Sequence, residues 1–246
     1  MKFAVLTDIH ANREAFEAVL ADEAARRADR IIILGDVVGY GPDPGWCCDK
    51  AAALVAAGAI CIRGNHDNAA SGAKEAMNSQ AQTAIDWTKT RLSAAQQAFL
   101  GGLPMTALVE DVLFVHASAK EPEAWNYVTS DTRATPSFRA SEARVILCGH
   151  VHVPLLVSRD IGGMVREHAF SIGQAIPLIR SRRWLAVVGS VGQPRDGVPE
   201  AGYVMLDSGA NELTFRRVPY DVMATVQKMR AAGLPEPLAL RLFRGI

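Results

Sequence analysis

The stretch Lys2–His10, "KFAVLTDIH", sets the architecture of the N-terminal part of the chain. Its apolar residues are β-formers without helical period, and the run stops at Thr7 and Asp8, so it predicts a short buried strand. The next residues, 11–29, predict a helix with Asn12 as its N-cap. The apolar stripe of that helix consists of Phe16, Val19, Leu20 and Ala24. A strand leading directly into an amphipathic helix predicts the start of a βαβ unit.

Two further strands extend this pattern. Residues 30–36, "RIIILGD", are almost continuously apolar, which is typical of a strand buried on both faces. A Gly- and Pro-rich loop follows, then an Ala-rich helix over about 46–57 and a third strand at 59–65, "AICIRGN". The alternation predicts a parallel sheet covered by helices.

The rest of the chain is richer in strands. Residues 79–100 predict helix with a break at Ser93, where "SAAQ" matches a capping box. Hairpins are predicted at 106–118, 155–170 and 203–218, a buried strand at 144–150, and a return to helix at about 220–243. We therefore predict an α/β fold of four layers, α-β-β-α, in which two mixed β-sheets pack face to face and are flanked by helices. No linker divides residues 1–246, so we expect a single domain.

Composition narrows the possible partners. The chain has 26 basic and 26 acidic residues and no long block of like charge, so it lacks the electrostatic footprint of a protein that binds duplex nucleic acid or an anionic membrane. No apolar run is long enough to cross a bilayer, and a cytoplasmic location is the default. The four cysteines, at 47, 48, 61 and 148, lack CxxC spacing and are predicted to be reduced.

Five of the six histidines stand in polar motifs at the ends of apolar strands: His10, His66, His116, His150 and His152. In "TDIH", Asp8 and His10 are two residues apart, so on an extended chain their side chains point to one face, and the same holds for the pair in "GHVH". A single motif of this kind is more often a capped strand end or a hydrogen-bonded core histidine. The repetition favours a metal site. We assign no role to His168.

Two other motifs carry possible ligands. Asp36 directly follows a strand in "LGDVVG", where Gly35 and Gly39 allow close approach to a crowded centre, although a simple turn would look the same. In "RGNHDN", Asn65, His66 and Asp67 could each bind a metal. The residues alone leave that choice open.

In order, the chain has D-x-H, G-D, G-N-H-D, H and G-H-x-H between Asp8 and His152. This series resembles the calcineurin-like metallophosphoesterase superfamily. The forms "LGDVVGYGPDP", "RGNHDNA", "VHAS", "GHVHVP" and "GSVGQPRDG" are similar to its small bacterial and archaeal phosphodiesterase-like branch. That branch usually has Asn-Pro before the last Gly-Ser, where this chain has Val187 and Val188.

The resemblance implies a dinuclear metal centre. One ion would be bound by Asp8, His10, Asp36 and His152, and the other by Asp36, Asn65, His116 and His150, with Asp36 as the bridge. Imidazole and carboxylate ligands suit divalent manganese, iron, zinc or nickel. The implied reaction is hydrolysis of a phosphodiester or phosphomonoester by a metal-bridging hydroxide. We expect His66 to act as general acid and Asp67 to orient its ring.

Other parts of the chain are assigned to the substrate. Arg195 is a candidate phosphate contact or else a solvated surface arginine. Tyr40, Trp125 and Tyr127 could shape the pocket or be ordinary half-buried aromatics, and segments 68–80 and 118–140 are expected to line its entrance. The expected partner is a small phosphate ester. The sequence leaves the oligomeric state open, and a homo-oligomer is one of the states that it allows. Two alternative functions remain. One is a non-catalytic protein-interaction scaffold, the role that the resemblance implies for members of the superfamily that lack the histidine corresponding to His66. The other is a nuclease.

Overall fold

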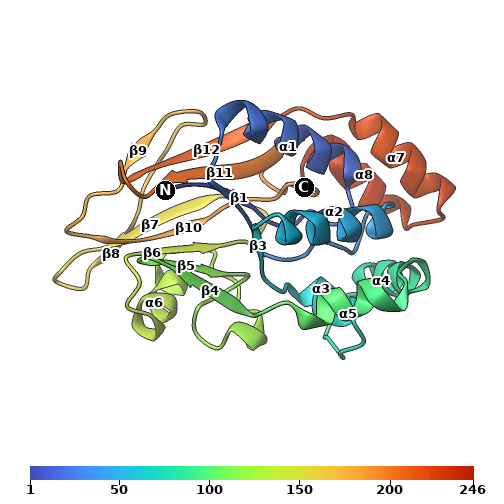
Figure 1. The fold of residues 1–246 in the computed structure, drawn as a ribbon, viewed down its shortest axis with the longest axis horizontal. Coiled ribbons are helices and arrows are strands. Elements are labelled where there is room, and N and C mark those ends of the chain that lie inside the picture. Colours follow the sequence, from blue (N-terminus) through green and yellow to red (C-terminus); the bar gives the residue numbers. More distant parts are fainter.

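The computed structural model describes the backbone of residues 1–246 and all side chains except that of Ala25. Its described strands form two sheets stacked on each other, with helices on the outside (Figure 1). Sheet A has the order β3-β2-β1-β11-β12-β9, and sheet B the order β4-β5-β6-β10-β7-β8. This arrangement confirms the predicted four-layer α/β sandwich.

The strands of sheet A are β1 (Lys2–Leu6), β2 (Arg30–Ile33), β3 (Ile60–Cys61), β9 (Ile176–Pro177), β11 (Ala201–Asp207) and β12 (Glu212–Val218). Those of sheet B are β4 (Thr106–Val109), β5 (Val112–Val115), β6 (Val145–Cys148), β7 (Leu155–Arg159), β8 (Val165–Glu167) and β10 (Arg183–Val187). In sheet A, β1, β2 and β3 are mutually parallel, and in sheet B the parallel strands are β5, β6 and β10. Each mixed sheet therefore has a parallel part whose carboxyl ends lie along one edge.

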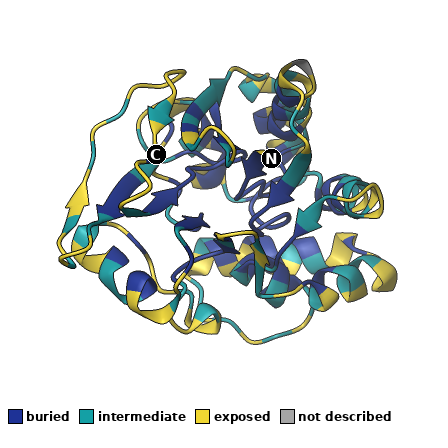
Figure 2. Cartoon of the chain, turned by 60° about the vertical axis from the view of Figure 1, so that its left-hand side comes forward, coloured by how far each residue is buried: buried dark blue, intermediate teal, exposed yellow. Residues whose placement is uncertain are grey.

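The core between the sheets is apolar. Phe3 and Val5 of β1 face Phe114 of β5 and Leu147 of β6, all four fully buried, and the rings of Phe3 and Phe114 meet edge to face at 5.6 Å. In Figure 2 the strands at the centre are coloured mainly as buried, whereas the outer helices also carry many exposed residues. Burial of each such side chain contributes about 1.5–3 kcal/mol, so this layer holds the two parallel parts in a fixed relation.

Helices complete the outer layers: α1 (Arg13–Arg26), α2 (Pro44–Ala56), α3 (Asn65–Ala70), α4 (Ser79–Arg91), α5 (Ala94–Gly102), α6 (Asp131–Ala140), α7 (Val222–Ala231) and α8 (Glu236–Arg244), with a short 3₁₀ turn η1 (Pro122–Ala124). In Figure 1, α1 lies above sheet A and α6 below sheet B, while α3, α4, α5, α7 and α8 gather at one end of the sandwich. No helix of the described residues is long and apolar enough to span a membrane.

Several local predictions are confirmed. Asn12 caps α1 by accepting a hydrogen bond from the Ala15 N–H, and Ser93 with Gln96 forms the predicted capping box of α5. The three predicted hairpins appear as β4–β5, β7–β8 and β11–β12. All four cysteines are free and buried.

Other predictions were wrong or incomplete. Ala24 is exposed, and Glu23 is buried in its place because its carboxylate accepts the Ala28 N–H just beyond the end of α1. The third strand is shorter than predicted, since β3 keeps only Ile60 and Cys61 before the chain turns toward Asn65. Helix α6, with Pro136 inside it, was not predicted.

Candidate metal centre

Six strand ends meet at one end of the sandwich. In sheet A, Asp8 and His10 follow β1, Asp36 follows β2, and Asn65 and His66 follow β3. In sheet B, His116 follows β5, His150 and His152 follow β6, and Arg195 follows β10. A hydrogen bond joins the ends of the two sheets: the carbonyl of Leu34, the residue after β2, lies 2.7 Å from Nδ1 of His116, which follows β5. Convergence of the carboxyl ends of parallel strands thus collects all the predicted site residues.

The backbone at these ends is not extended as predicted. Asp8, His10, Asp36, His150 and His152 all have φ between 49° and 68°, in the left-handed region. Residues other than glycine rarely adopt this conformation, and such strain clusters at functional sites. The expectation that neighbours two apart share one face is therefore wrong, and the side chains converge because each strand end turns sharply.

One cluster consists of Asp8, His10 and His152, whose potential ligand atoms all lie within 4.8 Å of one another. His152 Nε2 is 3.2 Å from Asp8 Oδ1 and 3.1 Å from His10 Nε2. Asp8 Oδ1 is buried yet forms no hydrogen bond of acceptable geometry with any described residue. A buried carboxylate oxygen without a partner is costly, and a cation in the cluster would satisfy it.

The second cluster consists of Asp36, His116 and His150, again within 4.8 Å. His116 Nε2 lies 3.2 Å from His150 Nδ1 and 3.3 Å from Asn65 Oδ1. Asp36 stands between the clusters, because its Oδ2 is 3.5 Å from His116 Nε2 and 3.7 Å from His10 Nε2. The structure therefore brings together all seven predicted ligands, and His66 forms a third group with His10 and Asp36 that could also hold an ion.

Backbone carbonyls orient three of the rings. The Nδ1 atoms of His10, His116 and His152 face the carbonyls of Val38, Leu34 and Gln193 at 3.3, 2.7 and 2.6 Å. A neutral histidine that donates from Nδ1 keeps a lone pair on Nε2, so the Nε2 atoms of His10 and His152 direct lone pairs at each other. This contact is unfavourable unless a cation lies between them, and carbonyl-bound histidines of this kind are typical of metal ligands.

Burial and neighbouring charges shift the pKa values of the cluster in opposite directions. Burial disfavours the charged form of Asp36, but His116 and His66 outweigh it and hold the Asp36 pKa well below its usual range. Burial would lower the pKa of His116, but Asp36 raises it to about 9. Burial lowers the pKa of His150 to about 3, and that of His10 falls well below its usual value for the same reason. Without a metal, Asp36 and His116 thus form a buried ion pair beside the neutral imidazoles of His10 and His150. A divalent cation would replace the His116 proton, and the resulting set of imidazoles and carboxylates fits such a cation.

Glycines allow the strand ends to pack this closely. A Cβ on Gly64 would lie 2.1 Å from Asp36 Oδ1, and one on Gly149 would lie 2.0 Å from Thr7 Oγ1. A Cβ on Gly192 would lie 1.8 Å from the Ile9 carbonyl oxygen. Three loops of the centre therefore depend on a missing side chain.

The structure corrects the predicted role of Asp67. Its two carboxylate oxygens accept hydrogen bonds from the backbone N–H groups of Val38 and Gly64, at 3.2 and 3.1 Å. His66 Nδ1 has no hydrogen-bond partner among the described residues, so Asp67 does not orient that ring. The reason is position: Asp67 is on the first turn of α3, where its side chain satisfies free N–H groups and joins the loops after β2 and β3.

Packing, in place of a hydrogen bond, holds the His66 ring. Its centroid lies 4.8 Å from that of His10 and 4.4 Å from that of Tyr40, and Gly39 leaves the space beside its Nδ1. His66 also lies within 4.8 Å of ligand atoms of His10 and Asp36. Burial lowers its pKa to about 4, despite the opposing charge of Asp36.

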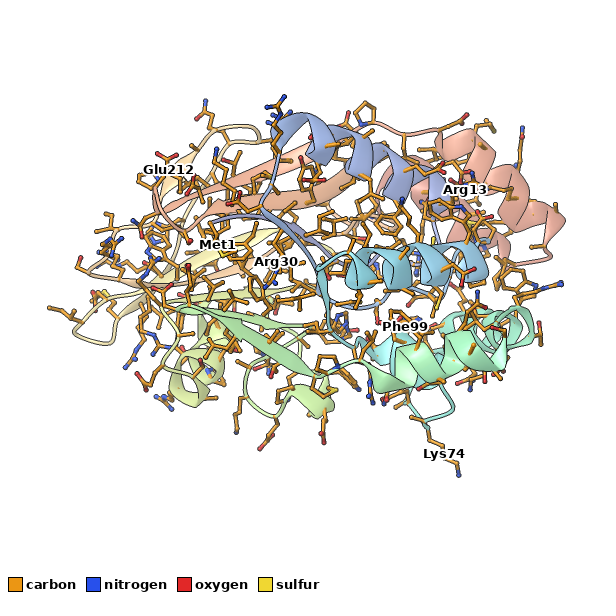
Figure 3. All side chains as sticks on the ribbon, viewed as in Figure 1. Met1, Arg13, Arg30, Lys74, Phe99 and Glu212 are labelled. Atoms are coloured by element: carbon orange, nitrogen blue, oxygen red, sulfur yellow. The ribbon has the colours of Figure 1, made fainter. Side chains whose placement is uncertain are left out.

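A small cavity of about 80 Å³ opens onto the clusters. Arg195 and Tyr40 form one side, with the guanidinium 5.8 Å from the ring centroid, and Tyr127 and Met77 also line the cavity. Both segments predicted at the entrance thus contribute, 68–80 through Met77 and 118–140 through Tyr127. Lys74 of the first segment is exposed and points away from the body of the molecule (Figure 3).

Some supporting residues were not predicted. The Thr7 hydroxyl donates to Asp8 Oδ2 at 2.8 Å, and the Ser190 hydroxyl donates to the Asp8 carbonyl at 2.9 Å. Gln193 faces His152 through its carbonyl and accepts hydrogen bonds from Arg195 through its side chain. Ser190 and Gln193 belong to "GSVGQPRDG", so the motif was a usable signal, whereas nothing in the local sequence marks Thr7.

The C-terminal helices brace the same site from behind. Tyr40 packs in a cluster with Val226 and Met229 of α7 and Leu238 and Leu242 of α8. The carbonyl of Gly245 accepts a hydrogen bond from the Gly197 N–H, at 2.8 Å, in the loop that carries Arg195. The helix pair thereby holds both the Tyr40 and the Arg195 walls of the cavity.

Comparison with known proteins agrees with this geometry. Residues 1–211 match the calcineurin-like phosphoesterase superfamily domain, and the chain belongs to that superfamily. The crystal structure of a metallophosphoesterase from Sphaerobacter thermophilus superposes with a TM-score of 0.88 at 38% identity, over 100% of both chains. An uncharacterised protein of Methanocaldococcus jannaschii is 35% identical over 98% of this chain and 97% of its own. A hypothetical protein from Pyrococcus horikoshii, 19% identical, shares the fold with a TM-score of 0.79 over 100% of this chain and 98% of its own.

These findings confirm the predicted family. The family is metal-dependent, and the clustered histidines and aspartates could bind metal. Family and relatives support phosphoester hydrolysis in general.

Proposed function

We propose that the protein is a dinuclear metal-dependent phosphoesterase acting on a small phosphodiester or phosphomonoester. Asp8, His10 and His152 would hold one divalent ion, and Asn65, His116 and His150 the other. Asp36 would be shared by both. Manganese, iron, zinc and nickel fit this set of imidazole, carboxylate and amide donors.

The observation that carries the proposal is the position of Asp36. Its Oδ1 accepts the backbone N–H of His66 at 2.8 Å, which leaves Oδ2 between His10 of one cluster and His116 of the other. A single carboxylate oxygen placed between two histidine clusters could be shared by two neighbouring ions. A site for one structural ion would need neither the second cluster nor the open cavity beside it.

The chemistry follows from the residues around the cavity. Two bound divalent ions would supply Lewis acidity at the phosphoryl oxygens and a water of lowered pKa as nucleophile. Arg195, the one arginine or lysine among the described residues lining the cavity, would bind a phosphoryl oxygen through its guanidinium. His66, also at the cavity wall, would give a proton to the leaving oxygen, with its ring held by Tyr40 and His10. Because burial lowers its pKa to about 4, the ring would take up that proton only when an anionic phosphoryl group binds beside it.

The proposal is tested by loading the protein with each metal and assaying p-nitrophenyl phosphate, bis-p-nitrophenyl phosphate and a nucleotide panel. We expect two ions per chain and turnover of at least one ester. Full occupancy of both sites without any turnover would contradict the hydrolase and favour the scaffold alternative.

The role of His66 has its own test. We expect His66→Asn to keep both ions and to lose at least about 100-fold in turnover of an alkyl ester, and much less on a nitrophenyl ester, whose leaving group needs no proton. His168→Asn is the matched control, because His168 is hydrogen-bonded to Ser158 on the β7–β8 hairpin and lies outside the clusters. Equal losses on both esters would show that His66 does not act as the acid.

A further inference from the structure

The cavity is too small to enclose a whole substrate. Its volume of about 80 Å³ is well below the roughly 300–1,000 Å³ of pockets that surround a small molecule. A phosphoryl group placed against the clusters would therefore leave the organic part of the ester at the mouth. The residues at the mouth then decide which organic groups are favoured.

Tyr127 is the aromatic residue at that mouth. Its side chain is 54% exposed, whereas Tyr40 on the other side of the cavity is 7% exposed. One face of the Tyr127 ring stacks on the imidazole of His150, with centroids 4.1 Å apart and planes inclined by 24°. Because His150 covers that face, the exposed area lies on the rest of the ring, which lines the cavity next to the second cluster.

The backbone around Tyr127 is well anchored. The preceding residue, Asn126, accepts the Ser118 N–H through its carbonyl at 3.1 Å, and the following residue, Val128, is fully buried. Trp125 meets the His116 ring edge to face at 5.7 Å. A large aromatic ring held in place and left open on one face loses little conformational entropy when it binds a ligand.

We propose that Tyr127 determines specificity by stacking on a planar aromatic group that lies next to the scissile phosphate. Aromatic rings prefer offset stacking with centroids about 4.5–7 Å apart, and such contacts tolerate many ring types because each offers a π face. The proposal rests on the phosphoesterase function given above and adds the class of its substrates, aryl-bearing phosphate esters.

The test compares ligands that differ only in ring planarity. Benzyl and cyclohexylmethyl phosphates, as monoesters and as methyl diesters, are assayed with the metal-loaded protein. We expect Tyr127→Leu to lower kcat/KM for the benzyl ester by about tenfold, mainly through KM, and to change the cyclohexylmethyl ester less than twofold. Tyr127→Phe should restore the benzyl value, since it keeps the ring. Metal content is measured in each variant, which separates an effect on stacking from an effect on His150.

Binding of benzylphosphonate and cyclohexylmethylphosphonate, measured by calorimetry, makes the inference independent of turnover. If the parent protein prefers the benzyl compound and Tyr127→Leu loses that preference, stacking is supported even when no ester is hydrolysed. The absence of hydrolysis would then contradict only the proposed function. Equal losses for both ring types, or no loss for either, overturn the inference.

Discussion

The two sheets contribute differently to the metal centre. The strand ends of sheet A supply both carboxylates and the amide, whereas those of sheet B supply three imidazoles: His116, His150 and His152. Neither half is complete alone, because the His150 N–H donates to Asp8 at 2.9 Å and His116 is oriented by the Leu34 carbonyl. The difference shows that both carboxylates come from sheet A and three of the four imidazole ligands from sheet B, while each sheet orients ligands of its partner.

The largest expected effect comes from removing the shared charge of sheet A. Asp36→Asn should empty both ion positions and lower turnover by more than about 100-fold, since even indirect contacts to a metal contribute 10–100-fold. His150→Asn, on sheet B, should remove one ion and leave the other. Metal stoichiometry by mass spectrometry separates the two variants. Retention of both ions by Asp36→Asn would show that the two halves do not share a ligand.

Filling the space beside Asp36 should be the next most damaging change. A Cβ at Gly64 meets the Asp36 carboxylate and backbone, so Gly64→Ala should reduce stability by about 2 kcal/mol or more and weaken metal binding. Gly102→Ala at the end of α5 is the control, because a Cβ there has no atom within 4 Å. Urea unfolding of both variants measures the difference. Equal stabilities would mean that the loops after β2 and β3 can separate.

Acid should weaken both halves when metal is absent. His10, His66 and His150 have lowered pKa values, about 4 for His66 and about 3 for His150, so below about pH 6.5 the unfolded chain binds protons that the folded chain does not. The stability that depends on these neutral histidines is present above that pH and is lost on acidification. The pKa of Asp67 is raised to about 7, so the folded chain binds one proton there that the unfolded chain does not, which offsets part of the loss. We expect the free energy of unfolding to fall on the order of 2 kcal/mol per pH unit between pH 6 and 4.

Unfolding in chelator, compared with the metal-loaded protein at the same pH values, checks this dependence. A flat profile without metal would mean that the three imidazoles can take up protons while the protein stays folded.

The smallest effect is expected from Asp67 on α3, which joins two loops that follow strands of sheet A. Asp67→Asn keeps one acceptor but cannot serve both the Val38 and Gly64 N–H groups, so stability should fall by about 1 kcal/mol with turnover within tenfold of the parent. Differential scanning calorimetry and steady-state assays measure the two quantities. A loss of turnover as large as that of His66→Asn would show that Asp67 orients the His66 ring, contrary to the hydrogen bonds described above.

Much of the fold was predictable because its signals are local. The capping box at Ser93 and the apolar runs of β1, β2 and β6 specify their elements without distant partners. Helix α6 was missed because Pro136 interrupts its pattern, and what stabilises it is burial of Ala134 and Phe138 against sheet B. Strand β9 is two residues long and exists through its pairing with β12.

The sequence by itself determined which donors stand at the strand ends and in what order, because ligand chemistry belongs to the individual side chain. Only the tertiary structure decided how they meet. The structure sets the left-handed turns at Asp8, His10 and Asp36, the attachment of Asp67 to two loops, and the stacking of Tyr127 on His150. Each of these depends on segments that are distant along the chain and that the sheets bring together. Local preference disfavours such turns, and the packed sandwich around them overcomes it.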